Sequence, residues 1–337
     1  MGKASQVVKL VRKINVGRLF DTAKEISKKT GRNRVGIFFD IVWCGMKYSA
    51  GYMDYKVFEF YNLNKKQRAT YVTRGYNNEL IRTLNDKAYW DDFMDKVKFN
   101  RKFERQLRRG WLEFDGCTQK QLEDFCKDKE FIITKPLDAC CGKGIEKLKI
   151  SDFESIQALY EYLKEIGCGL VEEVVVQHPD MARIYPNAVN TIRTATILTG
   201  GRVTVVYAFV RIGNKGHVVD NLNSEGMAAP LDVQTGIIKR PAADKDGVVY
   251  ESHPQTGARI LGAQIPFWNE AVALCKECAT VIPQVRYVGW DVAITKDGPV
   301  IIEGNQFPGH DILQLPVHVP DKIGMLPRIQ EALREEN

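Results

Sequence analysis

The sequence lacks a regular cysteine framework. Its eight cysteines are scattered without regular spacing along 337 residues. Cys275 and Cys278 form a CxxC pair, but no second CxxC and no HxxxH accompanies them, so a zinc site of the usual spacing is not expected. We expect reduced, packed cysteines, as in proteins of a reducing compartment.

The sequence also lacks a long apolar run. Its longest apolar stretch, residues 35–46, contains Asp40 and is too short to span a bilayer. The basic N-terminal segment is not followed by the apolar region of a secretion signal. Gln6 stands where a myristoylation motif requires Ser or Thr. We therefore expect a cytoplasmic protein without a membrane span.

Length and composition indicate a globular chain with two or three small domains. Apolar residues make up 44% and charged residues 27%, and the net charge is +6. A dense basic run contains Arg101, Lys102, Arg105, Arg108 and Arg109. Such a run either binds an anionic partner or forms a solvated helix face. We favour the solvated face, and no nucleic-acid partner is expected because no nucleic-acid-binding motif lies beside the run.

The hydrophobic pattern changes near residue 85. Residues 1–84 have apolar and basic positions at helical spacing, and Asn85 is predicted to cap a helix over residues 88–103. Further on, the pattern predicts strands at 131–135, 145–150, 169–177, 192–198 and 203–211 and a hairpin at 287–302. It also predicts helices at 152–165, 266–282 and 326–333, and a loop-rich stretch over 213–263. This order indicates an α+β fold with largely antiparallel sheets.

Asp291, Glu303 and Asn305 form the sharpest candidate site. They lie on the two strands of the predicted 287–302 hairpin and its continuation. A three-residue turn at 296–298 sets Asp291 opposite Glu303, whereas a two-residue turn at 297–298 places it on the other face. We predict the three-residue turn. Two carboxylates and an amide oxygen on one face suit Mg²⁺, and the alternative is a solvent-facing acidic strand.

A second candidate site is the strand–turn–strand segment 131–150. Lys135 ends the first strand, and Gly142, Lys143 and Gly144 follow in the turn. Glycines let backbone N–H groups approach a phosphate, and the lysines supply positive charge. The GxxxxGK[ST] pattern of a Walker A loop is absent. An ordinary glycine-rich hairpin remains the alternative.

The run Glu172-Glu173-Val174-Val175 is a third candidate. An edge segment of this kind binds adenine through backbone N–H and C=O groups. The alternative interpretation is an ordinary strand.

In this order, the three segments resemble the ATP-grasp superfamily over about residues 85–315, and more closely its sugar-transfer-associated branch. The closer resemblance rests on Asp54-Tyr55 to Phe60-Tyr61, Asn85-Asp86-Lys87, Ile133 to Pro136, Asn190 to Arg193, Val210 to Gly213, Asp220-Asn221, Gly289 to Asp291, Glu303 to Asn305 and Pro308-Gly309. The resemblance implies two α+β lobes that clamp ATP. It predicts a helical region over 1–84, an N-lobe over 85–175 and a C-lobe over 176–337.

The resemblance also implies a role for each matching residue. It implies that Lys87 and Lys135 contact the ATP phosphates under the 142–144 loop, and that Glu172, Glu173 and Val175 bind adenine. It assigns the ribose to Gln177 or His178, and Mg²⁺ (one or two ions) to Asp291, Glu303 and Asn305. Arg193 and Arg211 would bind the γ-phosphate, the acyl phosphate or the substrate carboxylate. The paired Cys140-Cys141 departs from the small or polar residues usual in the phosphate loop.

These roles predict an ATP-dependent ligase that joins a carboxylate to an amine through an acyl phosphate. The resemblance suggests an amino acid and a sugar acid or glycan precursor, as in polysaccharide biosynthesis. The alternative is a kinase, for which His310 and Asp311 are candidate bases. A non-catalytic nucleotide sensor is a third hypothesis, and the presence of all three metal-site residues argues against it. A homo-oligomer stays open.

Overall fold

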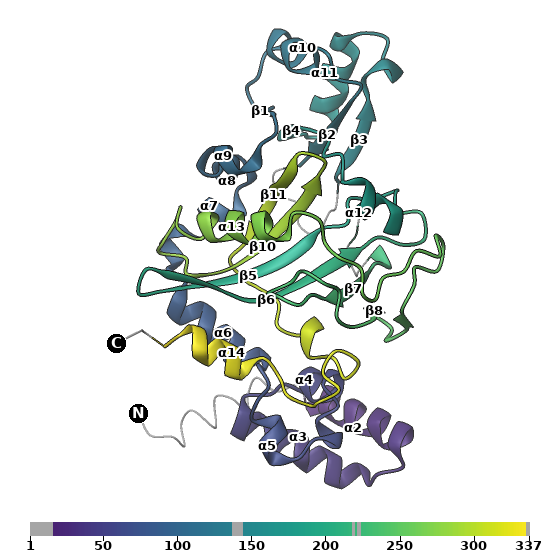
Figure 1. The fold of residues 1–337 in the computed structure, drawn as a ribbon, viewed down its shortest axis with the longest axis vertical. Coiled ribbons are helices and arrows are strands. Elements are labelled where there is room, and N and C mark those ends of the chain that lie inside the picture. The colour runs from purple at the N-terminus through teal and green to yellow at the C-terminus, as the bar shows by residue number, and fades with distance from the viewer. Residues whose placement is uncertain (1–15, 137–143, 218–219, 221–223, 335–337) are drawn as a thin grey trace. The chain divides into compact units, whose positions relative to one another are not determined.

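The computed structural model describes residues 16–136, 144–217, 220 and 224–334 (Figure 1). The chain forms two compact units. The first contains residues 1–80 and 309–330, and the second contains residues 81–308 and 331–337. Residues 309–330 therefore join the first unit, and the predicted lobe boundary at residue 175 stays a prediction.

Short helices build the first unit, as the periodicity predicted for residues 16–84. They are α2 (Val16–Thr30), α3 (Arg34–Tyr48), α4 (Tyr52–Val57), η1 (Phe60–Asn62), α5 (Lys65–Arg68), α6 (Arg74–Leu84, which extends into the second unit), η5 (Ile312–Gln314) and α14 (Leu326–Ala332, likewise shared). Asn33 caps α3 by accepting hydrogen bonds from the N–H groups of Val35 and Gly36. Leu19 and Ile26 of α2 are buried with Ile37 and Ile41 of α3 in one core.

A four-stranded antiparallel sheet forms part of the second unit. Its strands are β1 (Trp111–Glu113), β2 (Phe131–Lys135), β3 (Glu146–Lys149) and β4 (Leu170–Glu173), in the order β1-β4-β2-β3. Helices α10 (Gln119–Cys126) and α11 (Ile156–Glu165) pack on it, with Leu122, Leu159 and Val171 in the shared core. The short η3 (Ile150–Asp152) precedes α11.

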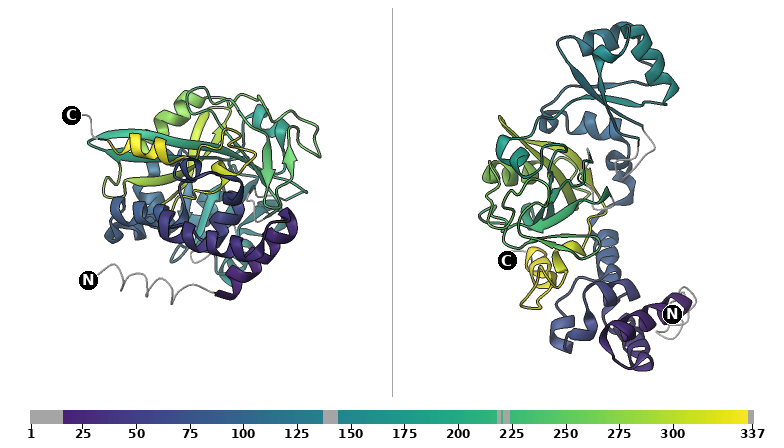
Figure 2. Two further views of the ribbon diagram at one scale, coloured as in Figure 1. Left: turned by 90° about the horizontal axis from the view of Figure 1, so that it is seen from below. Right: turned by 90° about the vertical axis from the view of Figure 1, so that its right-hand side faces the viewer.

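A seven-stranded antiparallel sheet completes the second unit, and Figure 2 shows it from two further directions. Its order is β11-β10-β5-β6-β7-β8-β9, with β5 (Ile192–Thr199), β6 (Arg202–Ile212), β7 (Met227–Pro230), β8 (Ala242–Asp244), β9 (Val249–Tyr250), β10 (Tyr287–Thr295) and β11 (Gly298–Asn305). Strands β7 to β9 lie in the stretch predicted as loop. The prediction was of a loop-rich stretch, which is otherwise confirmed, and strands this short leave no measurable periodicity.

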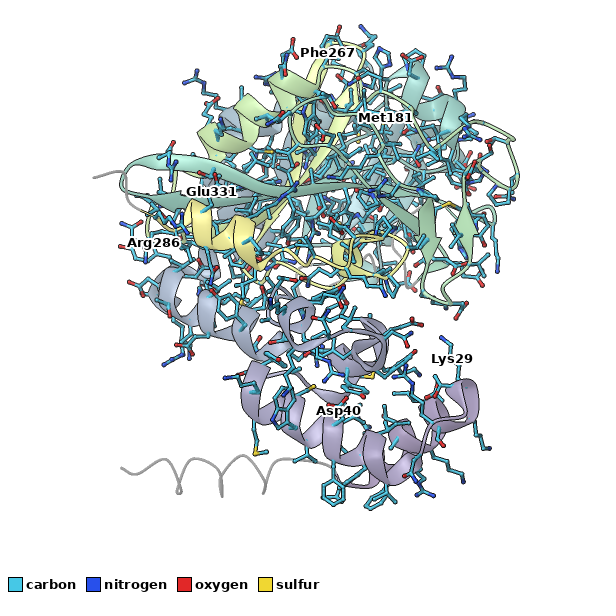
Figure 3. All side chains as sticks on the ribbon, turned by 60° about the horizontal axis from the view of Figure 1, so that its bottom comes forward. Lys29, Asp40, Met181, Phe267, Arg286 and Glu331 are labelled. Atoms are coloured by element: carbon cyan, nitrogen blue, oxygen red, sulfur yellow. The ribbon has the colours of Figure 1, made fainter. Side chains whose placement is uncertain are left out.

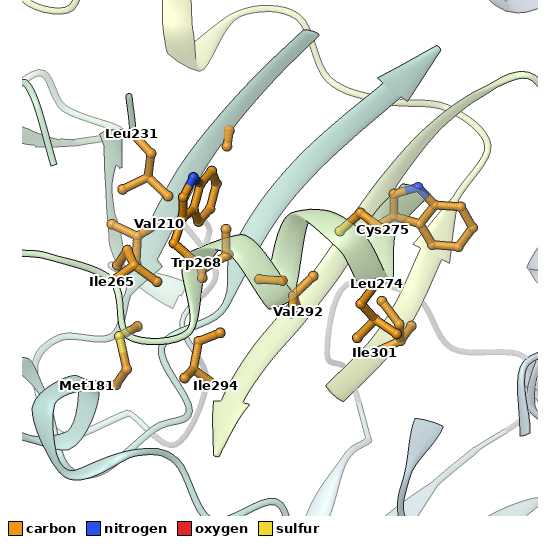
Figure 4. Packing of buried hydrophobic residues seen from close by; sticks show 14 of the residues in the cluster. Met181, Val210, Leu231, Ile265, Trp268, Leu274, Cys275, Val292, Ile294 and Ile301 are labelled. Atoms are coloured by element: carbon orange, nitrogen blue, oxygen red, sulfur yellow. The ribbon is translucent and has the colours of Figure 1, made fainter. Parts of the chain in front are cut away.

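One face of this sheet is covered by α13 (Trp268–Cys278), as Figure 4 shows. Val288, Trp290, Val292 and Ile294 of β10 all belong to the resulting apolar core. Because strand side chains alternate, Asp291 is directed to the opposite face. The hydrophobic core thus fixes which way the candidate site faces. The remaining helix, α12 (Pro179–Ile184), contributes Met181 to the same core.

The turn between β10 and β11 differs from its prediction. Thr295 pairs with Gly298, so the loop contains two residues, Lys296 and Asp297. Asp291 nevertheless pairs with Glu303, as predicted, because the register shifts by one residue between Asp291 and Val292. A bulge in β11 therefore sets Asp291 opposite Glu303, as the predicted three-residue turn was expected to do.

The predicted helix over residues 88–103 is broken into short pieces. They are η2 (Lys87–Tyr89), α7 (Asp91–Met94) and α8 (Lys96–Lys102), followed by α9 (Glu104–Leu107). Asn85 does not cap them. Its amide nitrogen donates to the carbonyls of Tyr287 and Gln306, both at 2.8 Å, and its oxygen accepts from the N–H of Tyr287. Asp86 and Asp95 are the residues that cap η2 and α8.

The cysteines behave as predicted where the structure describes them. Six of the eight are free and buried, whereas Cys140 and Cys141 lie outside the described residues. Burial raises the pKa of Cys275 to about 12 and raises that of Cys278 further, so both thiols of the CxxC pair stay neutral packing groups. No helix among the described residues is long and apolar enough to cross a membrane.

Candidate functional site

A row of three charged residues crosses adjacent strands of the seven-stranded sheet. Arg193 on β5 pairs with Asp291 on β10, and Asp291 pairs in turn with Glu303 on β11. Directly opposed residues of antiparallel strands point to the same face, so the three side chains lie side by side. Gly289 leaves room for this row, since a Cβ there would lie 3.2 Å from Cδ of Arg193.

Asp291 is held by two arginines. Its carboxylate accepts hydrogen bonds from Nε and Nη2 of Arg193, the latter at 2.8 Å, and from Nη2 of Arg211 at 2.7 Å. Arg211 also donates to the hydroxyl of Thr191 and lies 3.5 Å from the carboxylate of Asp220. Burial disfavours the charged form of Asp291, but the two guanidinium groups outweigh burial and hold its pKa well below the usual range.

Glu303 has the opposite electrostatic environment. Part of its side chain is accessible to solvent, yet the protein packed around the carboxyl group and the adjacent negative charge of Asp291 together raise its pKa. A carboxylate that repels its neighbour in this way is stabilised by a bound cation. A metal ion bound between Asp291 and Glu303 would therefore offset the repulsion between the two carboxylates.

Asp291, Glu303 and Asn305 were predicted to bind Mg²⁺, and this assignment stays a prediction. Asn305 lies two residues from Glu303 on the same strand face, and its Oδ1 accepts one hydrogen bond, from the N–H of Phe307 at 2.8 Å. Within the described ranges, no group of three or more His, Cys, Asp or Glu side chains forms a metal site by itself. This small set is typical of Mg²⁺, which binds one or two carboxylates together with substrate phosphates.

A buried ionic cluster lies on the four-stranded sheet. Glu172 on β4 is only 3% exposed, and its carboxylate contacts Nζ of Lys135 at 2.7 Å, Nη2 of Arg109 at 3.1 Å and Nδ2 of Asn100 at 2.9 Å. Burial opposes ionisation of Glu172, but the two cations lower its pKa to about 2. Glu172 and Lys135, both predicted as nucleotide residues, are therefore direct partners.

This cluster contains two cations and one carboxylate. The excess positive charge is buried, and a buried excess charge favours a bound anion such as a nucleotide phosphate. Arg109 and Asn100 were not predicted as part of it. Arg109 was assigned to a solvated helix face, which is wrong for this residue, since its side chain is 5% exposed. Its neighbours Arg101 and Arg105 are 61% and 87% exposed and do fit that prediction.

The segment after β4 offers free backbone groups. The N–H groups of Val174, Val175 and Val176 donate no hydrogen bond to any residue that the structure describes. Backbone N–H groups rarely stay unpaired, so they bind water or a ligand here. Glu173 differs, because its N–H donates to the carbonyl of Gly110 and its carboxylate binds Lys129 at 3.1 Å. Val175 is thus better placed than Glu173 to donate to adenine, and both assignments stay predictions.

Gln177 and His178 have structural partners. The amide nitrogen of Gln177 donates to the carbonyls of Tyr185 and Ala188, and its oxygen accepts two bonds from Asn190. These bonds favour a structural role for Gln177. His178 caps α12 through Nδ1, which accepts from the N–H of Asp180. Neither arrangement tests a ribose contact, which stays a prediction.

The structure shows less about the other residues that were predicted to contact the ATP phosphates. Lys87 is exposed on η2. Gly144 has φ +70°, and a Cβ there would lie 2.9 Å from Cγ of Pro136, so this position requires glycine. Gly142 and Lys143 lie outside the described residues.

The candidate kinase bases have partners of their own. His310 bonds to Asp54 at 3.2 Å in the first unit. Asp311 precedes η5, where its carboxylate accepts a hydrogen bond from the N–H of Ile312.

Residues 66–331 match the model of a family described as sugar-transfer associated ATP-grasp. No curated protein matches the sequence.

Solved structures to which the chain shows some similarity include three ligases. The ATP-grasp ligase PsnB, solved with a minimal precursor, is 11% identical with a TM-score of 0.41, over 73% of this chain and 64% of that chain. D-alanine–D-alanine ligase from Bacillus anthracis is 14% identical with a TM-score of 0.43, over 76% and 73%. An L-amino acid ligase from Bacillus licheniformis is 16% identical with a TM-score of 0.39, over 72% and 48%. The chain thus spans less than two thirds of the first and third of these proteins.

Proposed function

Because the chain belongs to the sugar-transfer-associated ATP-grasp family, we propose that it is an ATP-dependent ligase that joins a carboxylate to an amine. The observation that carries this proposal is the pairing of Asp291 with Glu303 beside two arginines, of which Arg193 is buried and Arg211 partly buried. Paired carboxylates next to fixed cations suit a site that binds Mg²⁺ and nucleotide phosphates together.

The proposed reaction has two steps. An oxygen of the substrate carboxylate attacks the γ-phosphorus of ATP, and the bond to ADP breaks to give an acyl phosphate. The amine nitrogen then attacks the acyl carbon, phosphate leaves, and the nitrogen loses a proton to give an amide. Neither step needs an oxidant or a reductant.

The residues of the site would mainly provide position and charge. Arg193 and Arg211 are fixed by Asp291 and would stabilise the oxygens of the transferred phosphoryl group or the substrate carboxylate. Mg²⁺ held by Asp291, Glu303 and Asn305 would neutralise phosphate charge. Lys135 would bind phosphate next to Glu172, and the N–H of Val175 would bind adenine.

The substrates are proposed from the family description alone. An association with sugar transfer favours an amino acid and a sugar acid or glycan precursor as the carboxylate and amine partners.

The test is a product assay with the full chain. The protein is incubated with ATP, Mg²⁺ and pooled amino acids and sugar acids, and the γ-phosphate and product masses are followed. Free phosphate together with a product lighter than its parts by one water supports the ligase. A product that retains the phosphate would instead identify a kinase. The Glu303→Ala variant serves as the control for contaminating ATPases.

A further inference from the structure

An exposed apolar stripe runs along the outer face of α3. Val35, Phe39 and Met46 are 62%, 65% and 60% exposed, with half-buried Val42 between them. Their spacing of four, three and four residues places all four on one side of the helix. Single exposed apolar residues are ordinary, but a continuous stripe marks an interaction surface.

The neighbouring helix α2 widens this stripe. Val16 and Phe20, one helical turn apart, are 50% and 43% exposed. The ring of Phe20 stacks on Phe38 at 4.4 Å, and Phe38 meets Phe39 edge-on at 5.6 Å. We call this surface of α2 and α3 the aromatic patch; its residues are Val16, Phe20, Val35, Phe38, Phe39, Val42 and Met46.

The exposed residues of the patch are not part of the core of the first unit, although half-buried Phe38 and Val42 pack against it. On its inner side, α3 already buries Ile37, Ile41 and Cys44. Asp40, labelled on α3 in Figure 3, binds Arg68 at 2.8 Å and the hydroxyl of Tyr55 at 2.7 Å. The helix is therefore apolar on two sides, and of the patch residues on its outer side only Phe38 and Val42 also pack against the core.

Basic residues surround the patch. The guanidinium of Arg34 lies 5.5 Å from the ring centre of Phe20, and Lys24 and Lys28 follow Phe20 along the exposed side of α2. The first unit as a whole contains 18 lysines and arginines against 8 aspartates and glutamates, a net charge of +10. The rest of the chain contains 30 against 34, a net charge of −4.

We propose that the aromatic patch docks the protein on an anionic membrane surface. Exposed phenylalanines flanked by arginine and lysine suit the boundary between lipid headgroups and acyl chains, where rings insert and cations bind acidic headgroups. A second copy of the chain fits less well, because it would bring two units of +10 together. Docking of this kind needs no membrane-spanning helix, and the described residues contain none. This proposal does not depend on the ligase activity.

The test is flotation of the full chain with phosphatidylcholine vesicles, with and without phosphatidylserine. We expect binding to the anionic vesicles only, weakening as salt rises. Phe20→Ser with Phe39→Ser should weaken binding roughly tenfold. The matched control, Val248→Ser with Val249→Ser, removes exposed valines of the second unit and should bind like the unaltered chain.

A second pair of variants tests the contribution of the basic residues to vesicle binding. Arg34→Glu should weaken binding at least about fivefold, and Lys245→Glu, exposed on the second unit, should not. This pair also tests the proposal if the phenylalanine variant fails to fold, which circular dichroism would reveal.

Three outcomes would overturn the proposal: no binding of the unaltered chain to anionic vesicles, equal binding of patch and control variants, or a dimer in sedimentation that only the patch variants dissociate. The last outcome would assign the patch to a second copy.

Discussion

Asp291 and Glu303 lie directly opposite each other on β10 and β11, although the turn that joins the strands has only two residues. The extra residue of β11 restores the pairing before it reaches the site. Without this bulge, Glu303 would be out of register with Asp291 and Arg193. The geometry of the candidate metal site therefore depends on an irregularity in the strand.

Replacing Glu303 should separate catalysis from folding. Glu303→Gln keeps the size of the side chain but removes the charge that we assign to Mg²⁺. We expect ATP turnover to fall by roughly 10²–10³-fold and thermal unfolding to be nearly unchanged. Asp297→Asn makes the same chemical change on an exposed residue of the adjoining turn and should keep full turnover. Full turnover by Glu303→Gln would disprove the metal assignment.

Removing Arg109 should destabilise the second unit. Arg109→Met leaves the buried carboxylate of Glu172 with one cation and removes the bonds from Arg109 to the carbonyls of Ile301 and Ile302. Because Lys135 still pairs with Glu172, we expect a loss of about 1–3 kcal/mol in the free energy of unfolding, measured in urea, from the buried acceptors left without Arg109. Arg101→Met, at an exposed ion pair with Glu113, should change it by less than about 0.5 kcal/mol. Similar losses in both variants would contradict the burial argument.

Low pH should lower the free energy of unfolding, in part because Glu172 becomes protonated. Its pKa is lowered from 4.5 to about 2 in the folded chain, so its contribution to stability is complete above pH 4.5 and is lost as the pH falls toward 2. Between these values, the free energy of unfolding should fall with a slope that approaches about 1.4 kcal/mol per pH unit from this group. Urea unfolding of Glu172→Gln should show a shallower slope over the same range. Parallel curves for the two proteins would rule out this contribution.

A proline tests the adenine assignment. Val175→Pro removes an N–H that donates to no described residue, so stability should change little while ATP affinity falls about tenfold. Isothermal titration with an ATP analogue measures the affinity. Val176→Pro, at a side chain that is 72% exposed, is the control and should bind normally. An unchanged affinity in Val175→Pro, or an equal loss in both variants, would disprove the assignment of adenine to the N–H of Val175.

The sequence predicted the family, the α+β fold and the pairing of Asp291 with Glu303. These rest on spaced motifs and on strand alternation, which are local properties. The turn was predicted wrongly because a bulge changes the register without leaving a mark in the hydrophobic pattern. Asn85 was assigned to a helix cap because the preference of Asn for caps is local, whereas its bonds to Tyr287 and Gln306 join segments about 200 residues apart.

Arg109 shows a second limit of sequence reasoning. It follows four other basic residues, and nothing in that run distinguishes the buried arginine from its solvated neighbours. Only the pairing of β1 with β4 brings it to Glu172. The residues missed at the candidate site are thus those whose partners come from distant parts of the chain.

Arg109 also touches both sheets of the second unit, since its guanidinium bonds Glu172 of β4 and the carbonyls of Ile301 and Ile302 in β11. A nucleotide that displaced Lys135 from Glu172 would change the charge around this guanidinium. It would thereby change the strength of the hydrogen bonds from Arg109 to β11, the strand that contains Glu303. Thermodynamic linkage then requires reciprocity: by whatever factor nucleotide binding alters the affinity for the cation, the cation alters the affinity for nucleotide by the same factor.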